Sequence, residues 1–145
     1  MTAVIHNQKL DTPAERIFAF FRLAKERLFS ADSKKTASCS FLDMAVLKAA
    51  DEQHNPSMTD IADMLHIAGP SATSIIDRLV EQNELIRTED KDDRRVVRVS
   101  ITESGKKILK AGMKERIGKM EGLLSVLNEK ERVELDRIIT KVILQ

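Results

Sequence analysis

The sequence predicts a mainly α-helical protein of the α+β class, in which a single β-hairpin interrupts a series of helices. Three observations support this prediction: apolar residues recur at helical spacing over most of the 145 residues, capping patterns precede several of these stretches, and only one pair of segments alternates as strands do. The length suits one domain or one compact two-lobed unit. Hydrophobic residues make up 42% and charged residues 32% of the chain, which is typical of a soluble globular protein.

The first helix is predicted to begin at Thr12-Pro13-Ala14-Glu15, a capping box with proline at the first helical position. Apolar residues follow at helical spacing, and four of the five phenylalanines lie between Phe18 and Phe29. So much aromatic surface predicts that this helix packs into a core or against a partner. After a polar stretch at 30–40, a second helix is expected from about 41 to 51.

The next segment predicts two helices joined by a short turn. Ser57-Met58-Thr59-Asp60, with Thr59 as the cap, opens the first of them, and His66-Ile67-Ala68-Gly69 ends it. Pro70 begins a longer helix that runs to about 82. Two helices separated by a turn that contains glycine match the helix-turn-helix arrangement.

Two β-like segments follow, at 85–89 and 96–101, and the second alternates apolar and polar residues. Residues 90–95 between them are all charged, so we expect an exposed hairpin tip. A hairpin with a charged tip directly after a helix-turn-helix is a winged helix. A further helix should then run from Thr102-Glu103-Ser104-Gly105 to about 126, and a last one should begin at the capping box 128–131.

The charge is unevenly distributed along the chain. Residues 57–101 hold six Lys and Arg against nine Asp and Glu, a net charge of −3, whereas residues 102–145 carry +3 and the whole chain +1. This distribution differs from the uniform cationic surface of non-specific nucleic-acid binders. Any hypothesis of DNA binding therefore has to account for the acidic middle segment.

The composition argues against several other classes of protein. A single cysteine, Cys39, excludes an internal disulfide framework and a cysteine-based zinc finger, and the three histidines are scattered. No nucleotide-binding glycine pattern or hydrolase elbow occurs, so we expect no enzyme activity, no cofactor and no metal. No signal peptide or membrane-spanning stretch is evident, which predicts a cytoplasmic protein without a membrane partner.

Several stretches resemble the MarR family of bacterial transcription regulators, over about 40–144 and most closely over 57–109. The resemblance is carried by Ile76-Asp77-Arg78-Leu79, by the hairpin residues 93–99, by Ile101-Thr102-Glu103-Ser104-Gly105 and by residues 127–131. It implies a homodimer whose first and last two helices interlock, so that two winged helices bind one palindromic operator in double-stranded DNA. It also implies a ligand-responsive repressor with a small anionic or phenolic effector.

The resemblance further implies that residues 1–145 form a single unit, with a DNA-binding lobe at 41–101 and dimerisation helices at 12–30 and 102–145. The sequence independently agrees with an interface, because residues 123–144 are rich in apolar side chains. The chain also departs from the family pattern. The serine that commonly precedes the recognition helix is absent, so its capping role is lost or moved to Ser71. Asn83 replaces the usual glycine after that helix, and altered spacing around Leu85 predicts a shifted or bulged first wing strand.

A recognition helix reads base edges from its outward-facing N-terminal residues, and the wing adds contacts in the minor groove. The helix candidates are Ser71, Thr73, Ser74 and Arg78. For Arg78, a bidentate contact to guanine and an internal structural pairing remain equally open. The wing candidates are Lys91, Arg94 and Arg95, and we expect Asp93 to pin the wing through an ion pair.

The sequence leaves open an alternative function for the winged helix and a possible role for the single cysteine. A winged helix that serves only protein–protein contact, without DNA binding, would explain the acidic middle segment. Cys39 invites a redox-sensing role, but the chain has no tyrosine and the nearest basic residues along the sequence are Lys34 and Lys35. We therefore expect Cys39 to be an ordinary small packing residue.

Overall fold

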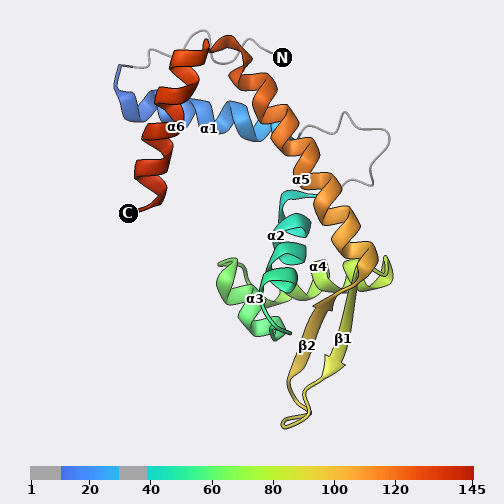
Figure 1. Ribbon diagram of the computed structural model, residues 1–145. Coiled ribbons are helices and arrows are strands. Elements are labelled where there is room, and N and C mark those ends of the chain that lie inside the picture. Colours follow the sequence, from blue (N-terminus) through green and yellow to red (C-terminus); the bar gives the residue numbers. More distant parts are fainter. Residues whose placement is uncertain (1–10, 30–38) are drawn as a thin grey trace. The chain divides into compact units, whose positions relative to one another are not determined.

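The computed structural model describes residues 11–29 and 39–145. The chain divides into two compact units (Figure 1). The winged-helix unit is Ala31–Glu115, and the terminal unit combines Met1–Ser30 with Arg116–Gln145. Within the described ranges, no helix is long and apolar enough to cross a membrane.

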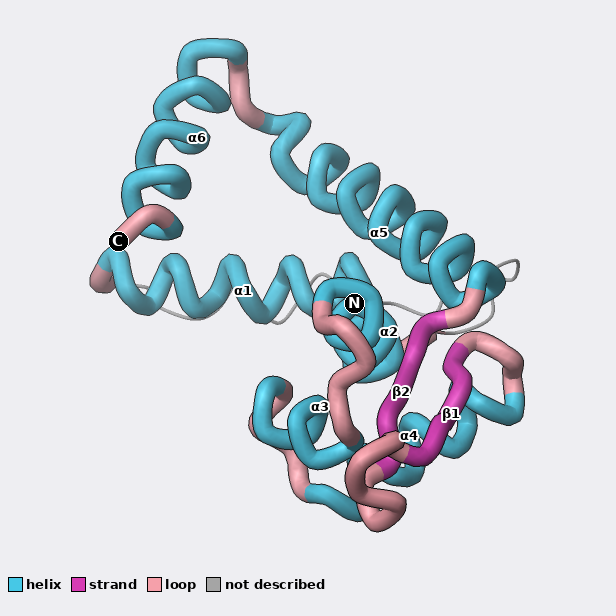
Figure 2. The backbone as a smooth tube through the Cα atoms, turned by 60° about the horizontal axis from the view of Figure 1, so that its bottom comes forward, coloured by secondary structure: helices cyan, strands magenta, loops and turns pink. Residues whose placement is uncertain are grey.

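The winged-helix unit contains the predicted helices and the predicted hairpin in the predicted order (Figures 1 and 2). Its elements are α2 (Phe41–Glu52), α3 (Met58–Met64), α4 (Gly69–Glu81), β1 (Leu85–Glu89), β2 (Val97–Ile101) and the first part of α5 (Glu103–Leu123). The mainly helical fold with a two-stranded wing is thereby confirmed.

One hydrophobic core holds the winged-helix unit together. Leu47, Ile61 and Ile76 from three different helices are completely buried in it. Met44 and Leu47 of α2 are both buried, because α2 packs against α3, α4 and β2 at once. Each fully buried aliphatic side chain of this size contributes about 1.5–3 kcal/mol through the hydrophobic effect.

Helices α2 and α3 each begin with a capping box. The Ser40 hydroxyl accepts a hydrogen bond of 3.1 Å from the Asp43 amide, and the Asp43 carboxylate accepts one of 2.8 Å from the Ser40 amide. Ser57 and Asp60 repeat this arrangement at 3.0 and 2.8 Å. The prediction of Thr59 as the α3 cap is wrong, because only Ser57 has a carboxylate three residues later.

Helix α4 differs from these two at its start and ends in a left-handed residue. Its N-cap is Ala68, which has no side-chain oxygen, and its first turn contains no acidic residue. Since Ser71 lies inside the helix, the capping role is lost rather than moved. Asn83 follows the helix with φ of 57°, as predicted for a residue in the place of glycine.

The wing, which we define as β1, β2 and the loop 90–96, is a regular antiparallel hairpin. Its register pairs Leu85 with Ile101 and Glu89 with Val97 through five consecutive partners. A bulged first strand is therefore excluded, whereas a strand shifted relative to the family pattern stays a prediction. The Val99 amide also donates a hydrogen bond of 2.9 Å to the Pro56 carbonyl, so β2 is attached to the segment between α2 and α3.

The start of α5 is fastened to the end of α4. The Thr102 hydroxyl donates to the Asn83 carbonyl at 2.7 Å and accepts from the Gly105 amide at 2.9 Å, while the Thr102 amide donates to the Glu84 carbonyl at 3.0 Å. A Cβ atom at Gly105 would overlap the Glu84 carbonyl oxygen and lie 2.8 Å from Ile101 Cγ1. Glycine is therefore required at position 105 by a close approach of two backbone segments.

The terminal unit contains α1 (Pro13–Phe29), the end of α5, a 3₁₀ turn (Leu124–Val126) and α6 (Glu129–Ile143). Both predicted capping boxes are present: Glu15 accepts from the Thr12 amide at 2.8 Å, and Glu131 accepts from the Asn128 amide at 2.9 Å. The helix predicted to reach about 126 changes to the tighter 3₁₀ form after Leu123.

Much of the apolar surface of this unit is exposed in the single chain. Phe18 is 75% and Phe21 64% exposed on α1, while Val142 is 66% and Ile143 73% exposed on α6. Large apolar side chains gathered in this way are a mark of protein–protein contact.

Candidate nucleic-acid interface

The N-terminal half of α4 presents three exposed hydroxyl side chains. Thr73 donates a hydrogen bond of 3.0 Å to the Gly69 carbonyl, and Ser74 donates one of 3.1 Å to the Pro70 carbonyl. Ser71 is exposed, and its hydroxyl makes no hydrogen bond with another residue in the described part of the chain. The hydroxyl protons of Thr73 and Ser74 are thus held inside the helix, while their oxygen lone pairs face outward as acceptors.

The first turn of α4 is also open to a close approach. A Cβ atom added at Gly69 would meet nothing within 4 Å. Because neither a capping side chain nor an acidic residue covers this turn, its backbone amides keep the partial positive charge of a helix N-terminus. The surface beside the exposed hydroxyls therefore favours anionic groups.

Arg78, the fourth helix candidate, is held by α2. Its two terminal nitrogens donate to the two carboxylate oxygens of Asp43 at 2.9 and 2.5 Å, and the Asp43 side chain is only 1% exposed. Burial acts to raise the pKa of Asp43, but the hydrogen bonds from Arg78 and from the Ser40 amide outweigh it and lower the pKa. Of the two alternatives for Arg78, the geometry favours an internal pairing that joins α4 to α2.

A second carboxyl group lies close to this pair. Glu84 is buried at the end of α4, and burial together with the negative charge of Asp43 raises its pKa above the ordinary value. Cys39 is half-buried, packs against the core and lies near enough to Arg78 to interact with its charge. The basic neighbours considered from the sequence, Lys34 and Lys35, lie outside the described residues.

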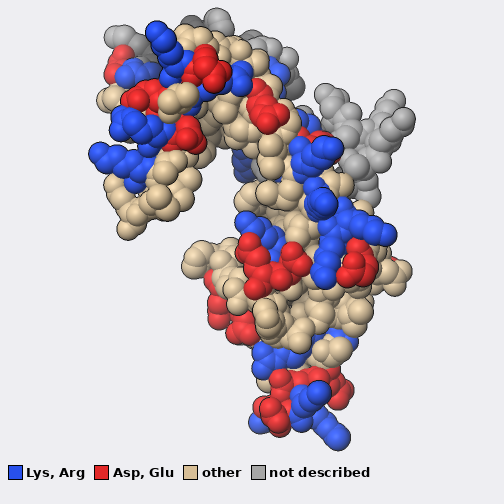
Figure 3. Space-filling view, viewed as in Figure 1, with Lys and Arg blue, Asp and Glu red and all other residues tan. Residues whose placement is uncertain are grey.

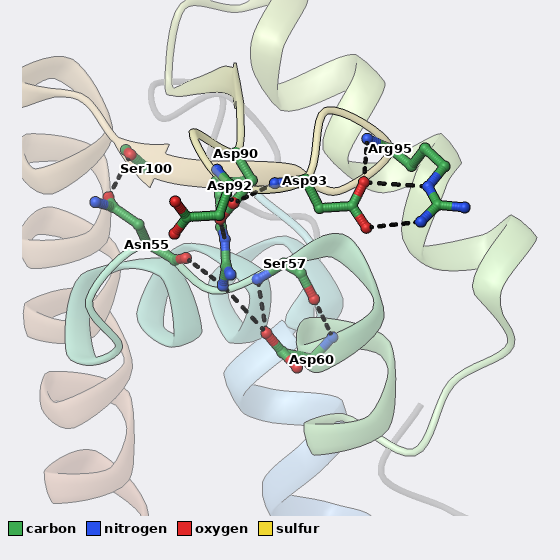
Figure 4. Close-up of polar contacts among 9 residues, drawn as sticks. Asn55, Ser57, Asp60, Asp90, Asp92, Asp93, Arg95 and Ser100 are labelled. Carbon is green, nitrogen blue, oxygen red and sulfur yellow. Dashed lines mark hydrogen bonds and ion pairs between the residues drawn. The ribbon is translucent and has the colours of Figure 1, made fainter.

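The wing loop is shaped by two aspartates. Asp90 accepts hydrogen bonds from the amides of Asp92 and Asp93 at 2.9 and 3.1 Å, and a third of 2.6 Å from Arg98 Nε. The Arg98 hydrogen bond, followed by the two amides, lowers the pKa of Asp90 to about 2. Asp93 accepts from the Arg95 amide at 3.0 Å and from Arg95 Nε at 3.1 Å (Figure 4).

The basic side chains of the wing differ in whether they form ion pairs within the protein and in how exposed they are. Arg87 on β1 forms an ion pair with Asp77 on α4, and two of its other nitrogens are buried. Arg95 is 91% exposed even though it is paired with Asp93. Lys91 and Arg94 are exposed and have no ion-pair partner among the described residues. At the wing tip, acidic and basic side chains lie beside each other (Figure 3).

Most of the acidic residues that weighed against DNA binding are neutralised or buried. Asp60 caps α3 and lies 3.9 Å from Arg98, Asp77 pairs with Arg87, and Glu84 is buried. Of the five acidic residues in 57–84, only Asp63 and Glu81 then remain exposed without an ion pair in the described residues. These pairs leave the net charge of −3 over residues 57–101 unchanged, because their arginines belong to the same segment, but they determine which of its charges remain unpaired.

Sequence reasoning missed the residues that organise this surface. Asp43 and Arg78 are 35 positions apart, and Asp90 and Arg98 are eight apart across the hairpin. The one available signal was the register of the hairpin, which brings the end of β1 beside β2 and so indicates that Asp90 and Arg98 are neighbours. Nothing local in the sequence pointed to Asn55, whose side chain accepts from the Ser100 hydroxyl at 2.7 Å.

The same arrangement of helices and wing occurs in known proteins. The model of the MarR family matches residues 42–97. The uncharacterized HTH-type transcriptional regulator YpoP of Bacillus subtilis (strain 168) is 34% identical over 67 residues, which are 46% of this chain and 48% of that relative. The matched stretch thus spans about half the length of this curated relative.

Two solved structures show the same fold over most of their length. The apo form of MarR from E. coli gives a TM-score of 0.79 at 18% identity and covers 93% of this chain and 98% of that one. BpsR of Bordetella bronchiseptica, whose DNA binding is regulated by 6-hydroxynicotinic acid, gives a TM-score of 0.63 at 22% identity. The match covers 88% of this chain and 98% of BpsR. The family match falls on the residues that build the helix-turn-helix and most of the wing, and the fold agrees with it. Over residues 42–97 the chain therefore resembles the MarR family of transcription regulators, and its fold is that of the solved MarR structure.

Proposed function

We propose that the protein is a sequence-specific DNA-binding transcription regulator that binds a palindromic operator as a homodimer. The observation that carries the proposal is the division of charge in the winged-helix unit. Within residues 57–101, four aspartates cap a helix or pair with arginines and Glu84 is buried, whereas Lys91 and Arg94 at the wing tip have no ion-pair partner among the described residues; the four aspartates are Asp60, Asp77, Asp90 and Asp93. Together with the exposed hydroxyls of α4, these two cations provide side chains that can bind phosphate and contact bases.

The proposed contacts follow from what each side chain has available. Ser71, Thr73 and Ser74 face the major groove and bind base edges or phosphates through short hydroxyls, which allow a close approach of the helix. Lys91 binds phosphate, and Arg94 with Arg95 enters the minor groove. Asp93 orients Arg95, since a free carboxylate there would be repelled by the DNA. We assign Arg78 to positioning α4 through Asp43.

The proposed homodimer rests on the exposed apolar side chains of α1 and α6. In this proposal residues 12–30 and 102–145 supply the interface, and residues 41–101 form the DNA-binding lobe of each subunit. The apolar residues of α6, such as Ile138, Val142 and Ile143, are 45–73% exposed in one chain. Covering them with the same helices of a second subunit would bury surface that one chain leaves in water.

The remaining parts of the proposal rest on the family. A ligand-responsive repressor is supported by the structural likeness to BpsR, whose DNA binding is regulated by 6-hydroxynicotinic acid, and the expected effector is a small anionic or phenolic molecule. Regulators of this family act by binding rather than by catalysis, so we propose no enzyme activity. We place the protein in the cytoplasm, where a transcription regulator meets the chromosome.

The alternative is a winged-helix module that binds only proteins, and the net charge of −3 over residues 57–101 is the observation that favours it. The two functions differ in their response to salt. Binding to DNA phosphates releases counterions, so log affinity falls linearly with log salt, by about 0.9 per phosphate contact. A protein–protein module would show no such dependence on a DNA duplex.

The test uses a duplex selected from a random library by the purified protein, titrated at several salt concentrations. Replacing both Lys91 and Arg94 with alanine removes up to four cationic contacts from a dimer, so the salt slope should fall by roughly 2–4 and the affinity should fall with it. Lys106→Ala removes the same kind of charge from an ion pair on α5 and serves as the matched control. The proposal fails if the doubly substituted protein keeps the affinity and the slope of the wild type.

A further inference from the structure

Arg98 on β2 connects three segments of the winged-helix unit. Its Nε donates to Asp90 Oδ2 at 2.6 Å, and its Nη1 donates to the Asn55 carbonyl at 3.4 Å and lies 3.9 Å from Asp60 Oδ2. These partners belong to the wing loop, to the segment between α2 and α3, and to the first turn of α3. Figure 4 shows Asn55 and Asp60 on the helical side of this network and Asp90 on the wing.

The network continues beyond the guanidinium in both directions. Asp90 also holds the amides of Asp92 and Asp93, which form the turn of the wing loop. Asp60 also accepts from the Ser57 amide at 2.8 Å and so completes the capping box of α3. A continuous series of polar contacts thus runs from the start of the helix-turn-helix to the tip of the wing.

Arg98 differs in this respect from the unpaired cations of the wing. Its guanidinium is engaged by two carboxylates and a carbonyl, and its side chain is 36% exposed. The pKa of Asp90 is about 2, so the Asp90–Arg98 pair is charged on both sides at physiological pH. In addition, the hydrogen bond from the Val99 amide to the Pro56 carbonyl attaches the middle of β2 to the segment between α2 and α3. The side-chain contacts extend that attachment toward the loop.

We propose that Arg98 is a positioning residue, which holds the wing against the helix-turn-helix so that Arg94 and the hydroxyls of α4 reach the DNA together. This inference rests on the proposed function and deepens it, because it names a residue that contributes to DNA binding without touching DNA. Its effect on binding is therefore exerted through Arg94.

The first test concerns the protein without DNA. In Arg98→Gln, Asp90 loses its charged partner, and the amides of Asp92 and Asp93 should exchange roughly two- to tenfold faster by NMR, the range that one hydrogen bond allows. Arg95→Gln removes the pair with Asp93 but leaves Asp90 and Arg98 in place, and it should leave these two amides unchanged. Unchanged exchange of both amides in Arg98→Gln would overturn the proposed tether.

The second test measures whether Arg98 controls the contribution of Arg94 to binding. In the wild-type background, Arg94→Ala should weaken binding to the selected duplex by about tenfold, as expected for loss of a charge-assisted contact. In the Arg98→Gln background the same substitution should weaken it less than about twofold. A general loss of stability would not change this ratio, and Arg98→Lys should restore part of it because the charge remains.

Two results would count against the inference in different ways. If Arg94→Ala is equally costly in both backgrounds, the wing reaches DNA without Arg98. If the double variant Arg94→Ala/Arg98→Gln has a salt slope lower by about 0.9 per subunit than Arg94→Ala alone, Arg98 is itself a phosphate contact. Wild-type protein that binds no duplex would instead refute the proposed function, whereas the amide-exchange result would still decide whether the tether exists.

Discussion

Gly105→Ala should destabilise the protein, although alanine is the better helix former. The added Cβ would overlap the Glu84 carbonyl oxygen and lie 2.8 Å from Ile101 Cγ1. The Glu84 oxygen cannot retreat freely, because it accepts hydrogen bonds from both the amide and the hydroxyl of Thr102, at 3.0 and 3.1 Å. Moving it would loosen the junction between α4, the wing and α5.

The expected magnitude follows from three contributions. Overpacking of a tight site costs about 1–3 kcal/mol, and weakening of the hydrogen bonds to the Glu84 carbonyl costs about 1 kcal/mol more. Alanine recovers at most about 1 kcal/mol of helix propensity relative to glycine. The net loss in free energy of unfolding should be about 1–3 kcal/mol.

Gly118→Ala is the matched control, since it makes the same chemical change in the same helix at a position with nothing within 4 Å. It should stabilise the protein by about 0.5–1 kcal/mol. Both variants are unfolded in urea at the same protein concentration as the wild type, because association shifts the apparent stability. If Gly105→Ala is as stable as Gly118→Ala, the close approach at Glu84 is not what requires the glycine.

Three further predictions follow from the ion pairs and the apolar surface. Asp43→Asn leaves Arg78 without its buried, charged partner and should lower the free energy of unfolding by about 1–3 kcal/mol. Glu134→Gln breaks an exposed ion pair and should change it by less than about 1 kcal/mol. Equal urea midpoints for the two variants would contradict this prediction. The pKa of Asp90 is lowered to about 2, so the order of the wing loop should be constant from pH 5 to 8 and be lost as the pH falls through about 2; a carboxyl NMR titration with its midpoint near 4 would disagree. Deletion of residues 128–145 should leave aggregated or unfolded chain, and a folded, monodisperse monomer in analytical ultracentrifugation would count against the proposed interface.

The elements of the fold could be predicted because their signals are local. Thr12 with Glu15 and Asn128 with Glu131 lie three residues apart, within the reach of one helical turn, and both capping boxes form as expected. Asn83 adopts the left-handed conformation that its place after α4 indicates. The α3 cap was misassigned, although the same spacing rule applied to Ser57 would have found it.

The arrangement of charges could not be predicted in the same way. Whether Arg78 faces DNA or the protein depends on α2, which places the buried Asp43 opposite it. The role of Arg98 depends likewise on the attachment of β2 to the segment before α3, and one strand's pattern carries no information about that attachment. Net charge along the sequence does not tell which groups are paired, so it could not indicate that Lys91 and Arg94 are the wing cations without an ion-pair partner among the described residues.

A regulator that searches a chromosome is slowed by every non-specific phosphate contact that it holds between sites. Among the described winged-helix residues, Asp77, Asp90 and Asp93 each pair with an arginine of the wing. These pairs leave few unpaired positive charges on the wing for phosphate contacts. We therefore expect short residence on random sequence, little sliding and frequent return to bulk solution. Occupancy of the operator would then be set mainly by how slowly the protein leaves it, and less by how fast electrostatic attraction brings it there.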